Sequence, residues 1–435
     1  MKSIRKVTRK YIVGGNEKMD EQKKDYRVEQ DSIGTKDVPK SVYYGVQSLR
    51  AAENFHITGL NMHPEIINSL AYIKKAAAIT NCEVGILDKT IADAIVKACD
   101  EILKGKLHDN FIVDPIQGGA GTSLNMNANE VIANRAIEIL GGKKGDYSIV
   151  NPNDHVNCGQ STNDVIPTAG KMTSLRLLKN LKYELELLYE ALCRKSEEFD
   201  HVIKMGRTQM QDAVPIRLGQ EFGAYSVAIQ RDIRRMDKAM DEMRALNMGG
   251  TAVGTGINAD KNYLKRIVPN IAEISGIDFI QAFDLIDSTQ NLDSFVAVSG
   301  AIKACAVTLS KIANDLRLMS SGPRAGFHEI NLPERQNGSS IMPGKVNPVI
   351  PEVVNQEQIA KDSKIMNFTV TSDNRYLFND TEIAAASLEQ TVTQHIKDYP
   401  DGLLIQVDDN AEHGAVVKLM DSARNAGMTS ISLSR

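Results

Sequence analysis

The sequence predicts a mainly α-helical protein built around a long central helical bundle, followed by a small C-terminal α+β module. Two observations predict this fold class. Three segments in the middle of the chain carry apolar residues every three or four positions over six or seven turns, which is typical of long bundle helices. The last roughly 70 residues instead alternate short β-rich runs with helical runs, as small α+β domains do.

The composition is that of a large globular protein. At 435 residues the chain is long enough for two or three domains. Its net charge is −4 with both signs interspersed, which argues against a nucleic-acid partner. No apolar run approaches the ~20 residues that span a bilayer, so no membrane span is expected. Five scattered cysteines without a CxxC pair favour a reducing compartment, and we expect the protein to be cytoplasmic.

The first 150 residues divide into two parts. Residues 1–25 are charged and lack the apolar core of a signal peptide, so they are expected to form a disordered extension. Residues 26–150 are expected to form an N-terminal helical domain of short helices and loops, with glycine-rich breaks at Gly118–Gly121 and Gly141–Gly142.

Residues 151–362 are predicted to form the central domain of long helices. The three apolar stripes lie at residues 175–192, 222–243 and 292–319. A bundle this elongated exposes apolar surface unless it associates with other copies, so an oligomer is expected.

Residues 363–435 are predicted to form the α+β module, in the order β-β-α-β-α-β. The expected strands are Phe368–Val370, Arg375–Phe378, Leu403–Val407 and Ser430–Leu433, and the expected helices are Ala386–Lys397 and Ala411–Ala426.

Residues 338–352 are the most informative segment of the chain. They combine Ser339, Ser340, Lys345, Asn347 and Glu352 with glycines and prolines that prevent a continuous helix or strand. A constrained loop with this set of groups suits the binding of a small anion and the movement of a proton.

Four further segments concentrate small polar groups beside predicted helix ends. Each of them alone is also explained by helix capping. Together they form a site rich in neutral donors, which suits a dicarboxylate, and the eight dispersed histidines show no metal-binding spacing. The segments are Gly121–Ser123 with Asn125, Gln160–Asp164, Gly206–Gln209 with Asp212, and Gly249–Thr251 with Gly254–Gly256 and Asn258.

These segments resemble the motifs of the aspartase/fumarase superfamily, in the same order along residues 26–355. The likeness is carried by Gly338–Glu352, Gly121–Asn125, Ser161–Asn163 and Gly206–Gln209. It implies a homotetramer with a shared helical bundle, active sites assembled from three subunits, and β-elimination across a succinyl skeleton. It implies no required cofactor and leaves open activation by a divalent cation such as Mg²⁺.

Several positions favour aspartate ammonia-lyases within this superfamily, with L-aspartate and fumarate as substrate and product. Ser161–Asn163, Val42–Arg50 and Pro348–Gln356 resemble the ammonia-lyase forms. Gln209 stands where fumarases have a histidine. Because ammonium leaves as ammonia and already carries its proton, a residue that does not titrate suits that position. A fumarate hydratase or another superfamily lyase remains the alternative.

The resemblance also assigns roles to residues. Ser339 matches the general base, and Glu352 matches a supporting carboxylate. The expected catalytic residues are Ser339, Lys345, Thr208 and Gln209, and the expected substrate-binding residues are Thr122, Asn125, Ser161, Thr162, Asn163, Thr208, Ser340, Lys345 and Asn347.

The superfamily likeness stops near Gln356, so the last bundle helix is expected to be truncated. Residues from about 365 to 435 are similar to the periplasmic domain of ExbD/TolR-type proteins, through Leu403–Asp408 and Gly414–Asp421. An inactive chimera whose C-terminal module is a protein-interaction domain is therefore a further alternative.

Overall fold

The computed structural model describes residues 25–118, 120–339, 341–342, 344–355, 365–378, 381–396, 399, 402–408, 411–428 and 431–434. The chain divides into two compact units, Met1–Thr308 and Leu309–Arg435. Residues 1–24 of the expected disordered extension lie outside the described residues. The expected start of the C-terminal module near residue 363 falls in the gap at 356–364, also outside them.

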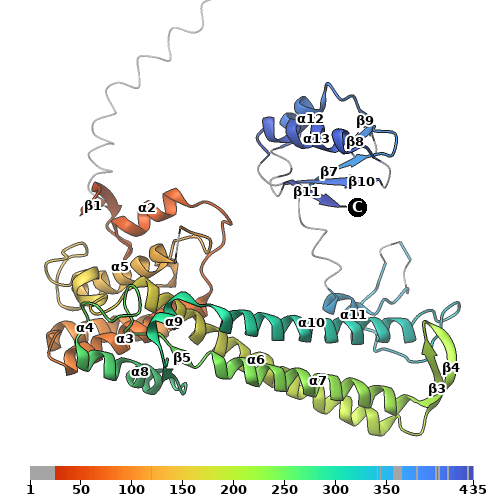
Figure 1. Cartoon of the computed structure of the whole chain (residues 1–435), viewed down its shortest axis with the longest axis horizontal. Helices are drawn as coiled ribbons and strands as arrows, with labels where there is room; N and C mark the ends of the chain where they lie inside the picture. Colours follow the sequence, from red (N-terminus) through yellow and green to blue (C-terminus); the bar gives the residue numbers. More distant parts are fainter. Residues whose placement is uncertain are drawn as a thin grey trace, which may run out of the picture. The chain divides into compact units, whose positions relative to one another are not determined.

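The first unit begins with an antiparallel hairpin that the sequence analysis did not predict, and continues with four helices (Figure 1). The hairpin strands leave most side chains partly or fully exposed, so they lack a clear apolar alternation. The elements are β1 (Tyr26–Asp31), β2 (Gly34–Pro39), α2 (Val46–Asn54), α3 (Pro64–Glu83), α4 (Lys89–Leu103) and α5 (Thr122–Ile139), with a 3₁₀ turn at His108–Asn110 and a π-helical turn at Pro152–Val156.

Helix α3 lies at the centre of this part of the core. It packs against α4, α6 and α8, and its alanines Ala76 and Ala77 are fully buried and allow close approach. At 20 residues, α3 is longer than the short helices expected for this region.

A buried carboxylate on α5 holds α2 in place. Glu130 accepts hydrogen bonds from the backbone N–H groups of Gly45, Gln47 and Ser48 at 2.9–3.0 Å, and from the Ser48 hydroxyl. The N-cap residue of α2 is Gly45, which has no side chain to accept these hydrogen bonds. The carboxylate of the distant Glu130 accepts them instead. Burial raises the pKa of Glu130, and these hydrogen bonds act against that rise.

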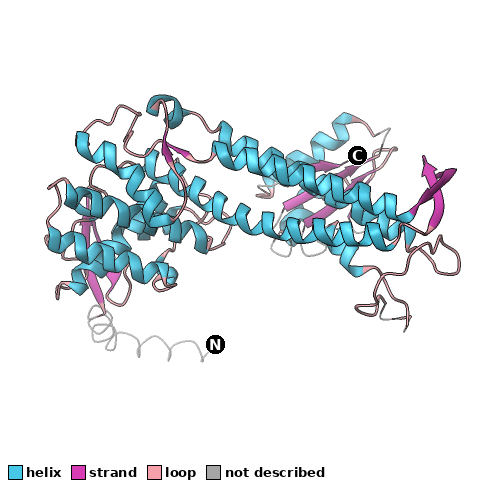
Figure 2. Cartoon of the chain, turned by 90° about the horizontal axis from the view of Figure 1, so that it is seen from below, coloured by secondary structure: helices cyan, strands magenta, loops and turns pink. Residues whose placement is uncertain are grey.

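The three long helices predicted from the apolar stripes are confirmed as α6 (Thr162–Glu198), α7 (Leu218–Glu242) and α10 (Asp293–Met319). Helices α6 and α7 run antiparallel and side by side, joined at their far end by the hairpin of β3 and β4 (Figures 1 and 2). The remaining elements here are β3 (Ile203–Thr208), β4 (Gln211–Arg217), β5 (Ala245–Leu246), α8 (Lys261–Ser275), β6 (Ile280–Gln281) and α9 (Leu285–Gln290).

Large apolar side chains remain exposed on the long helices of a single chain. Leu177, Tyr183 and Leu187 on α6 and Val227 on α7 are 41–58% exposed, and Val296 and Val307 on α10 are 69% and 64% exposed. This pattern is expected of helices that pack against other copies.

Helix α10 is also long and apolar enough to cross a membrane, with 22% of its most apolar stretch buried. This differs from the expectation that no apolar run of the chain approaches that length. A single such helix is weak evidence, because a bundle helix of a soluble protein has the same composition.

The second unit contains α11 (Val349–Val354) and the C-terminal module. The module has a five-stranded sheet in the order β11-β10-β7-β8-β9. Strand β10 is parallel to β7 and β11, whereas β8 is antiparallel to β7 and β9. Its elements are β7 (Ile365–Val370), β8 (Tyr376–Phe378), β9 (Thr381–Ile383), α12 (Leu388–His395), β10 (Gly402–Val407), α13 (His413–Asn425) and β11 (Ile431–Ser434).

The predicted elements of the module are confirmed within a few residues, and β9 is an additional strand. Its apolar core is its own, with Phe368 stacked on Phe378 at a centroid distance of 5.0 Å and with Leu403 and Leu419 buried. The module therefore has the separate core of a small α+β domain.

We predict that Glu130→Ala lowers the free energy of unfolding by about 3 kcal/mol or more, because it leaves three N–H groups at the start of α2 without their acceptor. Urea denaturation measures the change. Glu184→Ala, which removes an exposed carboxylate from α6, is the control and should change stability by less than about 0.5 kcal/mol. Equal effects of the two substitutions would contradict this role of Glu130.

Candidate functional site

The first part of the candidate site lies at the start of α5. Gly121 precedes the helix with a φ of +84°, a conformation that favours glycine, and an added Cβ would lie 3.0 Å from Ile166. Thr122 is exposed at the first position of α5, and Asn125 is buried one turn later. The amide N–H groups of a helix start attract anions, so this end suits a carboxylate.

The second part lies at the start of α6. The Ser161 hydroxyl accepts a hydrogen bond from the Asn163 N–H at 3.2 Å, and Asp164 accepts one from the Ser161 N–H at 2.9 Å. These bonds form a capping box. Ser161 therefore has a structural role in addition to the proposed substrate contact.

The two helix starts are joined through side chains. The Asn125 amide group donates to the Thr162 hydroxyl at 3.3 Å and to the Asn157 side-chain oxygen at 3.2 Å. The side-chain oxygen of Asn125 is buried and has no hydrogen-bond partner among the described residues. An orphaned acceptor beside two helix starts is consistent with a site that binds a donor group such as an ammonium.

The glycine-rich segment after α7 packs against the start of α6. The buried Asp164 carboxylate accepts hydrogen bonds from the N–H groups of Gly249 and Thr251 at 3.1 and 3.0 Å. The Asn163 amide donates to the carbonyl of Ala252 at 2.7 Å. The structure thus brings together three of the polar segments identified in the sequence.

A fully buried lysine supports this cluster from α3. The Lys74 ammonium donates to the side-chain oxygens of Asn157 at 2.8 Å and Gln160 at 3.0 Å. Burial lowers the pKa of Lys74 to about 7, although the Asp164 carboxylate raises it. Burial likewise raises the pKa of Asp164 to about 6, opposed by its backbone hydrogen bonds and by Lys74.

Sequence reasoning missed Lys74, Asn157 and the structural role of Asp164. A signal was present for the lysine, because Lys74 lies four residues after Leu70 on the apolar stripe of α3. A cation on such a stripe is expected to have buried polar partners.

Thr208 and Gln209 lie elsewhere, at the tip of the β3–β4 hairpin. Both side chains are exposed, and Gln209 and Met210 have φ values of 52° and 61°, as in a tight hairpin turn. Helix α6 has 37 residues, so its two ends are about 55 Å apart. One chain therefore cannot bring Thr208 and Gln209 to Ser161 and Thr162.

The segment from Gly338 to Glu352 belongs to the second unit and forms a closed loop. The Gly338 N–H donates to the carbonyl of Lys345 at 2.7 Å, and the Asn347 amide donates to the carbonyl of Gly338 at 3.2 Å. Ser340 lies outside the described residues. Lys345 is exposed, and Glu352 is half-buried in the first turn of α11.

Ser339 has a distinctive environment within this loop. Its hydroxyl oxygen accepts hydrogen bonds from the N–H groups of Ile341 and Met342 at 3.3 and 3.2 Å. Two converging N–H donors stabilise negative charge on an oxygen. This geometry suits the general-base role that the resemblance implies for Ser339.

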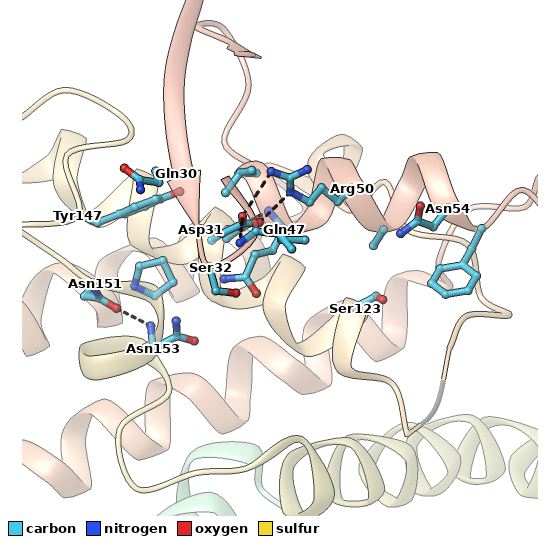
Figure 3. Close-up of a pocket in the computed structure, with 16 residues that line it drawn as sticks. Gln30, Asp31, Ser32, Gln47, Arg50, Asn54, Ser123, Tyr147, Asn151 and Asn153 are labelled. Atoms are coloured by element: carbon cyan, nitrogen blue, oxygen red, sulfur yellow. Dashed lines mark hydrogen bonds and ion pairs between the residues drawn. The ribbon is translucent and has the colours of Figure 1, made fainter. Parts of the chain in front are cut away.

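A cavity of about 540 Å³ also lies among β1, α2 and the start of α5 (Figure 3). Ser123 and Gln47 face it, and Arg50 is held there by two bonds to the Asp31 carboxylate at 2.9 and 3.3 Å. Sequence analysis did not identify this cavity, although Arg50 ends one of the segments that resemble ammonia-lyases. No group of three potential metal ligands occurs in the described parts of the chain.

Two known families match this chain, and their matches overlap at residues 321–360. Residues 34–360 match the family described as Lyase, and residues 321–435 match the family described as Biopolymer transport protein ExbD/TolR.

Curated relatives are similar to the first part. The aspartate ammonia-lyase of Bacillus subtilis (strain 168) is 59% identical over 333 residues, which are 77% of this chain and 70% of that protein. The aspartate ammonia-lyase of Helicobacter pylori (strain 26695) is 55% identical over 332 residues, 76% of this chain and 71% of that protein.

Solved structures have the same fold. A fumarate lyase:delta crystallin from Brucella melitensis bound to cobalt is 44% identical with a TM-score of 0.74, covering 92% of this chain and 82% of that one. A class II fumarase from Schistosoma mansoni is 37% identical with a TM-score of 0.73, covering 76% and 73%.

We predict that the stability of the protein rises with pH between about 7 and 8.5 by up to about 1.4 kcal/mol per pH unit, because of Lys74. The pKa of Lys74 is lower in the folded state than in the unfolded chain, so the unfolded chain binds more protons in this window. Raising the pH therefore favours the folded state. Above this range the buried thiols of Cys99 and Cys305, whose pKa burial raises, act in the opposite direction. Urea denaturation at several pH values measures the slope.

Lys74→Met should remove this slope. It should also destabilise the protein at every pH, because two buried amide oxygens lose their donor. Lys75→Met, which removes the neighbouring lysine paired with Asp100 at 2.6 Å, is the control and should retain the slope. An unchanged slope in Lys74→Met would contradict the prediction.

Proposed function

The chain belongs to the lyase family, and from this premise we propose that it is a carbon–nitrogen lyase that eliminates ammonia from L-aspartate to give fumarate. The observation that carries the proposal is Ser339 within its closed loop, whose hydroxyl oxygen receives two backbone N–H groups. Ser339 lies in a chain that is 50–59% identical to aspartate ammonia-lyases.

In the proposed reaction the ionised Ser339 oxygen removes a proton from Cβ of L-aspartate. The electron pair of that C–H bond moves into the adjacent carboxylate and forms a dianionic aci-carboxylate. It then returns to form the Cα–Cβ double bond as the C–N bond breaks. Ammonia leaves with the bonding pair of the C–N bond, and Ser339 later passes its proton to solvent.

Charge stabilisation is the main task of the remaining residues. The aci-carboxylate carries one more negative charge than the substrate carboxylate, so donors aimed at it lower the barrier most. We assign this task to Ser340, Lys345 and Asn347. Thr122, Asn125, Ser161, Thr162, Asn163 and Thr208 would bind the remaining carboxylate and the amino group.

Gln209 favours ammonia-lyase over fumarate hydratase activity. A hydratase must protonate a departing hydroxide and needs a residue that titrates, whereas an amide cannot donate that proton. The reaction balances without electron transfer, so we propose that it needs no cofactor. Activation by Mg²⁺ stays a prediction.

We further propose that the active site is composite and that the protein is a homotetramer. The length of α6 separates the residues at its start from Thr208 and Gln209 by about 55 Å. The exposed apolar side chains of α6, α7 and α10 offer the surface for such an assembly. All five cysteines are free, which supports a proposed location in the cytoplasm.

We predict that Ser339→Ala lowers kcat by about a thousandfold or more while KM changes little, because the base is lost and the binding groups remain. The ultraviolet absorbance of fumarate formed from L-aspartate measures the rate. Ser174→Ala on α6 is the control and should keep the rate of the unaltered protein. Near-normal turnover of Ser339→Ala would refute the role of this serine.

We also predict that two inactive variants restore activity when they assemble together. Thr162→Val and Thr208→Val change residues at opposite ends of α6, which a composite site takes from different subunits. Random mixing leaves about a quarter of the sites with neither substitution. Co-expression of the two differently tagged variants, followed by the fumarate assay, tests this.

Each variant alone provides the control for this mixing experiment. A mixture with no more activity than either variant alone would show that the sites are not shared. The mass of the assembly in solution, from size-exclusion chromatography with light scattering, tests the tetramer independently.

A further inference from the structure

A second pocket lies on the side of the long helices, away from the start of α6. It has a volume of about 300 Å³ and is formed where α6, the end of α7 and the end of α8 meet. Arg176 and Lys179 of α6 line it, about 22–27 Å further along the helix than Ser161. Arg244, just after α7, and Asp278, just after α8, complete the charged lining. None of these residues takes part in the proposed elimination.

The pocket has more positive than negative charge. Three cations and one carboxylate line it. Arg244 is paired with the Asp278 carboxylate at 3.5 Å and with Asp241, outside the lining, at 3.3 Å. The Asp278 side chain is 99% exposed, so water screens its charge strongly. Arg176 and Lys179 have no carboxylate partner in the described parts of the chain.

Arg176 is held in one orientation although no acid pairs with it. One of its terminal nitrogens donates to the carbonyl of Ser275 at 3.0 Å, and its guanidinium lies 4.5 Å from the centre of the Tyr72 ring. Its Nε is buried and has no hydrogen-bond partner. A buried donor without an acceptor is uncommon in folded proteins and calls for an explanation.

Capping of α8 explains only part of this arrangement. The bond to Ser275 satisfies a carbonyl at the C-terminal end of α8 and uses one of the five N–H donors of Arg176. It leaves Nε unsatisfied, and it does not account for Lys179 or for the pocket itself. A ligand with negative charge and several acceptor oxygens accounts for Lys179 and for the pocket, whereas Nε is buried away from solvent.

We propose that this pocket binds the phosphate group of a small molecule. A phosphate dianion carries three oxygen acceptors and matches the planar donor groups of arginine and the point charge of lysine. Lys179 provides a charge at the exposed side of the site, Arg176 provides donors from α6, and Arg244 provides donors from the turn just after α7. Bound phosphate would therefore link α6 to the ends of α7 and α8.

Isothermal titration of the full-length protein with inorganic phosphate and with glycerol phosphate tests the proposal. We expect one such site per chain. Lys179→Glu should weaken binding at this site by about tenfold or more, because it replaces an attractive charge with a repulsive one. Lys179→Arg should restore binding, and bound phosphate should raise the melting temperature of the unaltered protein but not of Lys179→Glu.

Lys238→Glu is the matched control, because Lys238 is an exposed lysine of α7 that does not line the pocket. It makes the same change in net charge and should leave phosphate binding unaltered. Equal weakening by Lys179→Glu and Lys238→Glu would mean general attraction to the surface and would overturn the proposal. Lack of phosphate binding at millimolar concentration would also overturn it. Tighter binding of glycerol phosphate than of inorganic phosphate would identify a phosphate ester as the ligand. Equal binding of the two would identify the free anion as the ligand.

Discussion

The buried carboxylate of Asp164 is the interaction on which the arrangement of the candidate site depends. It binds the N–H of Ser161 at the start of α6 and the N–H groups of Gly249 and Thr251, which follow α7. A carboxylate buried this deeply is costly unless several donors satisfy it, so these segments cannot separate without a large penalty. Lys74 adds a favourable charge from α3 and holds Asn157 and Gln160. The proposed substrate-binding residues at the start of α6 thus rest on a rigid buried network.

The length of the α6–α7 pair sets the second constraint. A helix of 37 residues gives a strong scaffold, but it places the hairpin residues Thr208 and Gln209 far from the helix start. The same helices expose apolar side chains that a single chain cannot cover. The proposed packing of these helices against other copies would account for both features. That packing would bring hairpin residues of one copy to the helix starts of another.

The C-terminal module does not share the buried network of the candidate site. Its sheet and two helices enclose a separate apolar core that includes Phe368, Phe378 and Leu403. It is similar to ExbD/TolR proteins, whereas residues 34–360 match the lyase family. The stability of the module therefore comes from local burial, and the proposed chemistry uses none of its residues.

The sequence by itself determined the class of the fold, the long helices and the family. These follow from local periodicity and from short motifs, which neighbouring residues encode directly. The β1–β2 hairpin and β9 were missed because short exposed strands lack a clear alternation. Only the tertiary structure decided which polar residues meet. Lys74, Asn125 and Asn157 are distant in sequence and became one network because α3, α5 and the start of α6 pack together. The separation of Gln209 from Ser161 was likewise decided by the fold, since two motifs in a linear sequence do not reveal the length of rigid helix between them.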